Sequence, residues 1–60
     1  MARNIYSVSP GERPILVRQE VQVSEHVIFI DYEINDPFAL VAAESADRAY
    51  EIAASLFMPD

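Results

Sequence analysis

Few side chains in this sequence are suited to catalysis or metal binding. The chain has one histidine, His26, and no cysteine, so the usual nitrogen and sulfur ligand sets for zinc cannot be assembled. A calcium loop needs alternating acids around a central glycine, and the single glycine, Gly11, has only Glu12 beside it. One glycine is also too few for a glycine-rich phosphate loop. The sequence therefore predicts neither a metal site nor a cofactor.

Asp31 and Glu33 are the acids whose spacing comes closest to acid–base chemistry. If both lie on one face of a strand, the strand rise places them about 7 Å apart, within the range of hydrolytic carboxylate pairs. Such a pair works only in a concave, partly dry site that separates the two pKa values. The open face of a sheet in a 60-residue chain offers no such site. No catalytic triad is predicted around the serines, and we expect a binding protein that is not an enzyme.

Charge is distributed unevenly along the chain, which has a net charge of −6 and no lysine. Residues 1–18 carry three arginines against one glutamate, whereas residues 19–60 carry nine acids against one arginine. This balance argues against binding DNA, RNA or anionic lipid, because each needs a basic surface. It is compatible with the opposite role, in which the protein presents acids to a basic partner. Solubility alone is the other interpretation of the same charge.

The length and composition predict a single small domain over residues 1–60. Hydrophobic residues make up 52% of the chain, which excludes a disordered protein. No apolar run approaches the ~20 residues that cross a membrane, and the lack of cysteine favours a reducing compartment. We therefore expect a cytoplasmic protein without a membrane partner.

Two stretches of alternating apolar residues predict most of a sheet. Residues 15–23 and 26–34 each alternate, and the two residues between them, 24–25, suggest a hairpin turn. A tight turn there pairs Val23 with His26 and Val21 with Ile28, so that the two residue numbers of each pair add to 49. In that register both apolar sets fall on one face, and Arg18 lies across from Asp31.

The remaining segments predict another strand or two and a helix. Residues 3–8 form a strand-like run, and the prolines and glycine of residues 9–14 indicate a turn. Residues 38–43 are either a strand or, with Pro37 at the first helical position, the start of one long helix. In both interpretations residues 46–57 are helical, with apolar residues at helical spacing.

These elements predict an α+β fold, an antiparallel β-meander of three to four strands with one C-terminal α-helix packed on one face. The expected core is Ile15, Val17, Val21, Val23, Ile28, Ile30, Tyr32, Ile34, Leu40, Ala49, Ile52, Ala53 and Leu56.

Acids and one aromatic residue on the outer face of the expected hairpin predict a partner-binding surface. Phe29 would be left in water there, as the anchor residues of protein interfaces often are in the free protein. Carboxylates spaced along a strand and continued on the helix would imitate a row of phosphates. The predicted partner-binding residues are Glu20, Glu25, Phe29, Asp31, Glu33, Glu44, Asp47 and Glu51.

The segment FALVAAESADRAYEIA, residues 38–53, is similar to a strand–helix unit of many small phage proteins, in which an apolar strand ends near a serine cap. As a whole, the short, acidic, cysteine-free chain resembles the anti-CRISPR proteins that act as DNA mimics. The resemblance implies a phage or prophage origin and action in the cytoplasm of the bacterial host. It also implies a target that normally binds DNA, such as a CRISPR surveillance complex.

The leading hypothesis is therefore a non-enzymatic inhibitor whose acidic surface mimics nucleic acid and blocks a basic DNA- or RNA-binding site on a host protein complex. The alternative is a small homodimerising or antitoxin-type interaction module, in which the exposed strand face or edge pairs with a second copy or a partner protein. The chain itself is either a monomer or a homodimer in these hypotheses.

Overall fold

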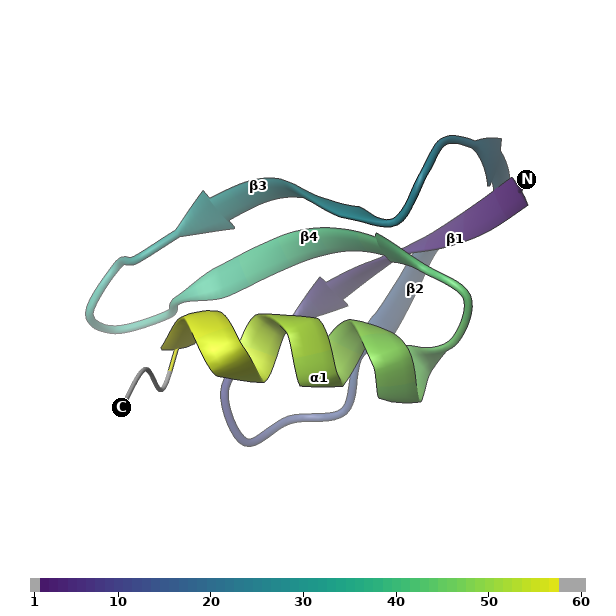
Figure 1. The fold of residues 1–60 in the computed structure, drawn as a ribbon. Coiled ribbons are helices and arrows are strands. Elements are labelled where there is room, and N and C mark those ends of the chain that lie inside the picture. Colours follow the sequence, from purple (N-terminus) through teal and green to yellow (C-terminus); the bar gives the residue numbers. More distant parts are fainter. Residues whose placement is uncertain (1, 58–60) are drawn as a thin grey trace.

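The computed structural model describes residues 2–57, which form four antiparallel strands and one helix (Figure 1). The strands are β1 (Ala2–Val8), β2 (Ile15–Gln22), β3 (His26–Asp31) and β4 (Phe38–Ala43), and the helix is α1 (Ala46–Phe57). The α+β fold with a C-terminal helix on one face is confirmed. Residues 38–43 are a strand, which decides between the two interpretations of that segment.

The strand order in the sheet is β2-β1-β4-β3. The expected hairpin between residues 15–23 and 26–34 is therefore wrong, because β2 and β3 form opposite edges of the sheet, roughly 14 Å apart at the usual strand spacing. Arg18 lies opposite Ile5 and Asp31 opposite Phe38, so Arg18 and Asp31 are not paired.

The composition of β4 explains this order. Its six residues, FALVAA, contain no polar side chain, and a strand of that kind is stable only where neighbours cover it on both sides. β4 therefore lies in the middle beside β1, and β2, which carries Arg18 and Glu20, takes one edge, where charges discourage aggregation.

A β-bulge in β3 changes which of its residues face the helix. Val27 lies opposite Val41 and Phe29 opposite Leu40, so Ile28 is the extra residue between them. Because of this shift, Val27 packs against the core although the alternation predicted it on the outer face.

A second irregularity lies in β2, whose pairing with β1 shifts twice. Glu20 has φ 54°, in the left-handed region that ordinary side chains rarely adopt. Its backbone N–H donates a 3.2 Å hydrogen bond to Oδ1 of Asn4 on β1, which supplies the partner that the broken ladder does not.

The core lies between α1 and the two middle strands. Apart from Tyr6, its buried members are alanines and valines, which let the helix approach the sheet closely, and partly buried side chains from β3 and α1 surround them. The buried cluster is Tyr6, Val8, Ala39, Val41, Ala43, Ala49 and Ala53, with Val27, Ile30, Ala46, Ile52 and Phe57 packed against it.

Part of the expected core is wrong. Ala49 and Ala53 are buried and Ile30 and Ile52 pack against the core, as expected. The expected core residues that are instead exposed to solvent are Ile15, Val17, Ile28, Tyr32 and Ile34. They belong to the edge strands or to the segment after β3, beyond the two middle strands on which the helix mainly packs.

Ser45 is the N-cap of α1. Its Oγ accepts a 3.2 Å hydrogen bond from the backbone N–H of Arg48, and Asp47 places a negative charge in the first turn. No helix within residues 2–57 has the length and apolar character needed to cross a membrane.

Replacing the N-cap should destabilise the protein measurably. We expect Ser45→Ala to lower the free energy of unfolding by about 1 kcal/mol, because it leaves a helix N–H without a partner. The measurement is urea denaturation followed by circular dichroism. Ser55→Ala is the matched control, since Ser55 bonds a carbonyl inside the helix and alanine favours helix there. Equal losses in the two variants would contradict a capping role.

Glycine should be favourable at position 20 and unfavourable at position 19. Glu20→Gly removes the strain of a left-handed backbone, which costs a residue with a side chain roughly 1–2 kcal/mol. Against this, glycine adds entropy to the unfolded chain, which costs about 0.5–1 kcal/mol. We expect a small net gain in the free energy of unfolding. Gln19→Gly, the adjacent control, has only the entropic cost and should destabilise. A loss of stability in both variants would show that Glu20 is not strained.

Candidate functional site

The eight predicted partner-binding residues do not share one surface. Phe29 is half-exposed on the side of the sheet away from α1, and Asp31 ends β3 on that same side. Glu20 lies on the opposite edge strand, β2. The predicted row through Glu20, Asp31 and Glu33 is therefore wrong as a single strip, because β1 and β4 separate the two edges.

Asp31 and Glu33 do not form the pair that the strand spacing predicted. β3 ends at Asp31, so Glu33 lies in the loop that follows rather than on the same strand. The backbone N–H of Glu33 donates a 3.0 Å hydrogen bond to Oδ1 of Asp31. This contact makes Asp31 the cap of a local turn.

Four of the predicted acids surround the end of the molecule where β3 begins and α1 starts. Glu25 precedes β3, Glu44 follows β4, and Asp47 and Glu51 are exposed on the first turns of α1. We call these four residues the acidic end.

Arg48 lies between two members of the acidic end. Its Nε and Nη2 donate hydrogen bonds of 3.0 and 3.1 Å to the two carboxylate oxygens of Glu25, and Nη1 donates one of 2.8 Å to Oε1 of Glu51. A forked pair of this kind fixes geometry as well as charge. It joins the start of β3 to α1 and holds both carboxylates in place.

These contacts shift the pKa values of the residues involved. The hydrogen bonds from Arg48 lower the pKa of Glu25, with a further contribution from the positive charge of Arg3. The hydrogen bonds that Arg48 donates to Glu25 and Glu51 raise the pKa of Arg48. Glu25 is therefore ionised at neutral pH. Within residues 2–57, neither Glu44 nor Asp47 takes part in an ion pair.

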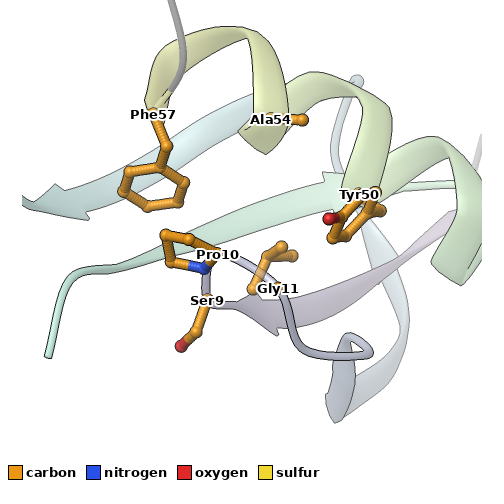
Figure 2. A pocket seen from close by; sticks show the side chains of 7 residues that line it. Ser9, Pro10, Gly11, Tyr50, Ala54 and Phe57 are labelled. Atoms are coloured by element: carbon orange, nitrogen blue, oxygen red, sulfur yellow. The ribbon is translucent and has the colours of Figure 1, made fainter.

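A small apolar pocket lies between α1 and the turn after β1. Figure 2 shows Tyr50 and Phe57 reaching from the helix toward Pro10 and Gly11. Its volume of about 30 Å³ has room for one or two water molecules but not for a substrate. We interpret it as an imperfection in packing rather than as a binding site.

A wider, open groove runs beside the pocket, between residues 11–14 and the first turns of α1. Asp47 and Tyr50 line it from the helix and Arg13 from the loop. Its volume of about 440 Å³ is open to solvent. Within residues 2–57, no three His, Cys, Asp or Glu side chains are placed to hold a metal ion.

The side of the sheet away from α1 was predicted least completely from the sequence. Cross-strand partners in an antiparallel sheet point to the same side, so the register identifies its residues. We call this surface the helix-free face. It consists of Ile15, Arg18 and Val21 of β2, Arg3, Ile5 and Ser7 of β1, Phe38, Leu40 and Ala42 of β4, and His26, Phe29 and Asp31 of β3.

Only Phe29 and Asp31 of this face were predicted to bind a partner. The others could be assigned only from the register, because β1 and β4 each turn alternate side chains away from the helix and the sequence of β4 has no polar residue to mark the exposed set. Ile5 and Leu40 are among these side chains. The wrong hairpin concealed this register because it paired the two edge strands with each other.

No family model, no curated protein and no solved structure matches this chain.

Arg48 should control the titration of Glu25. The lowered pKa of Glu25 means that its contribution to stability is present above its unfolded pKa and is lost as the pH falls through its folded pKa. We expect Arg48→Gln to raise the pKa of Glu25 toward its ordinary value, measured from the carboxyl ¹³C shift during an NMR titration. Arg13→Gln removes the same charge from the 11–14 loop and should leave this pKa unchanged. Equal shifts in both variants would mean that net charge, rather than the forked contact, sets the pKa.

Proposed function

We propose that this protein is a non-enzymatic inhibitor that docks its acidic end onto a basic, nucleic-acid-binding site of another protein. The observation that carries the proposal is the grouping of four acids around one arginine at one end of the molecule. Glu44, Asp47 and Glu51 are exposed there, and Glu25 and Glu51 both bond Arg48. The acids outnumber the arginine, so this end carries a local excess of negative charge that a basic partner would complement.

The rigidity of the acidic end favours binding over simple solvation. Glu25 and Glu51 are held by one guanidinium, so less side-chain entropy is lost when a partner binds them. Glu44 and Asp47 extend the negative surface along the connection from β4 to α1. Together these carboxylates present negative charge at successive points on a rigid framework.

The partner should be a protein surface that normally binds phosphates. Arginine forks bind carboxylates and phosphates with the same bidentate geometry, so an acidic surface can compete with a nucleic acid for them. Electrostatic steering would make association fast and sensitive to salt. The resemblance in size and charge to DNA-mimic anti-CRISPR proteins makes a CRISPR surveillance complex the target to try first.

The surface proposed here contains fewer residues than the one predicted from the sequence. Glu25, Glu44, Asp47 and Glu51 form the proposed surface. Phe29, Asp31 and Glu33 lie away from it, and Glu20 lies on the other edge strand, β2.

The test compares two double variants that change the net charge equally. Glu44→Arg with Glu51→Arg reverses two exposed members of the acidic end, and Glu33→Arg with Asp36→Arg reverses two exposed acids in the β3–β4 loop. Each tagged protein is used to capture proteins from a bacterial lysate at low and high salt. A captured nucleic-acid-binding protein is then assayed for DNA or RNA binding with and without the inhibitor.

We expect the unmodified protein and the loop variant to displace nucleic acid at low salt, and the acidic-end variant to be weaker by about tenfold or more. Circular dichroism confirms that both variants are folded. Equal inhibition by the two variants would show that the acidic end is the wrong surface. Capture of the same amount of partner at low and high salt would contradict charge mimicry altogether.

A further inference from the structure

We propose that the helix-free face binds the same face of a second copy, so that the protein forms a face-to-face homodimer. This inference concerns the side of the molecule opposite the helix and does not rest on the proposed inhibitor function. In such a dimer both helices and both acidic ends would point outward.

The helix-free face carries apolar side chains on all four strands, and those on the two edge strands are open to water. Ile15 is 64% exposed and Phe29 is 50% exposed, and both lie in one row across the sheet with Ser7 and Leu40 between them. Phe29 also packs against Phe38, with ring centroids 5.8 Å apart. An apolar surface formed by all four strands is typical of a protein interface, whereas scattered exposed residues are not.

The charges on this face are arranged so that a second copy complements them. Arg3 lies near the beginning of β1, and Asp31 lies at the far end of the edge strand β3, diagonally across the face. A two-fold axis in the interface, near Leu40 and Ala42, brings Arg3 of one copy over Asp31 of the other. By symmetry it also forms the reciprocal contact, as isologous interfaces do.

The local contacts of Arg3 and Asp31 favour pairing with a second copy. The Nε atom of Arg3 is buried and has no hydrogen-bond partner among residues 2–57, so the guanidinium is incompletely paired by the described residues. Asp31 is held in position by the N–H of Glu33 at 3.0 Å. Arg3 as a whole is only partly buried, and a carboxylate from a second copy would pair with its charge.

The sign of the charge on this face also favours a second copy. Chains with a net charge of −6 repel one another. The helix-free face, however, carries Arg3 and Arg18 against Asp31 alone. Two copies therefore approach with least repulsion through this face.

The edges of the sheet are less suitable for self-association. β2 has two register shifts and β3 has one. Bulges of this kind interrupt the row of backbone groups that a strand from another copy would need. Face-to-face packing needs no such row, because it buries side chains at the distance of stacked sheets, about 10 Å.

The size of the face is sufficient for a stable contact. The molecule measures 33 × 21 × 17 Å, so its broadest side, 33 by 21 Å, is comparable to the roughly 800 Å² that each partner buries in a standard interface. The helix-free face is formed by four strands and is a large part of the surface of so small a molecule.

The test is sedimentation velocity from low micromolar to near-millimolar concentration. We expect a monomer–dimer equilibrium for the unmodified protein and a dimer weakened by about tenfold or more in Phe29→Ser. Arg3→Asp and Asp31→Arg should each weaken the dimer, and the two together should restore it because they exchange the charges of a reciprocal pair. Circular dichroism confirms folding of each variant.

Ile34→Ser is the matched control, because Ile34 is 94% exposed but lies in the loop after β3, outside the face. It should leave the dimer unchanged. A protein that stays monomeric at every concentration overturns the proposal. A dimer that Phe29→Ser and Ile34→Ser affect equally, or one that the double charge exchange does not restore, overturns it as well. The acidic-end variant should dimerise normally, so failure of one proposal is distinguishable from failure of the other.

Discussion

Packing of one helix against two strands is the constraint on which the rest of the structure depends. A helix with its side chains is about 10 Å wide, and neighbouring strands lie about 4.8 Å apart, so α1 can cover two of the four strands well. Ala49 and Ala53 bring it close to Val41 of β4 and Val8 of β1. The edge strands are left only partly covered, and the opposite side of the sheet is not covered by the helix at all.

This constraint also determines where the charges and the apolar side chains can lie. Burial of Val8 and Val41 under the helix places the alternate residues of β1 and β4, such as Ser7 and Leu40, on the helix-free face. Four of the acids, by contrast, lie where the chain passes from β4 into α1 and from β2 into β3. The molecule thus has an acidic end and an apolar face. These two surfaces differ in the partners that their chemistry suits.

Two local irregularities adapt the edge strands to this arrangement. The bulge at Ile28 turns Val27 toward the helix while Phe29 stays on the opposite side. The left-handed Glu20 is compensated by the side chain of Asn4. Both features modify an exposed edge, where a regular strand would invite unwanted pairing. The Arg48 contact with Glu25 then ties the start of β3 to the helix that the middle strands support.

The sequence by itself determined the fold class and the helix, because the apolar spacing of residues 46–57 is a local pattern. It left residues 38–43 open between a strand and the start of one long helix, and pairing with β1 and β3 decided for the strand. Only the tertiary structure decided the strand order, since alternation in residues 15–23 and 26–34 is satisfied by any neighbour of suitable polarity. A bulge shifts the alternation by one residue, and this placed Val27 inside and Ile28 outside. The grouping of Glu25 with Glu51 likewise depended on Arg48, whose reach across two elements no local pattern reveals.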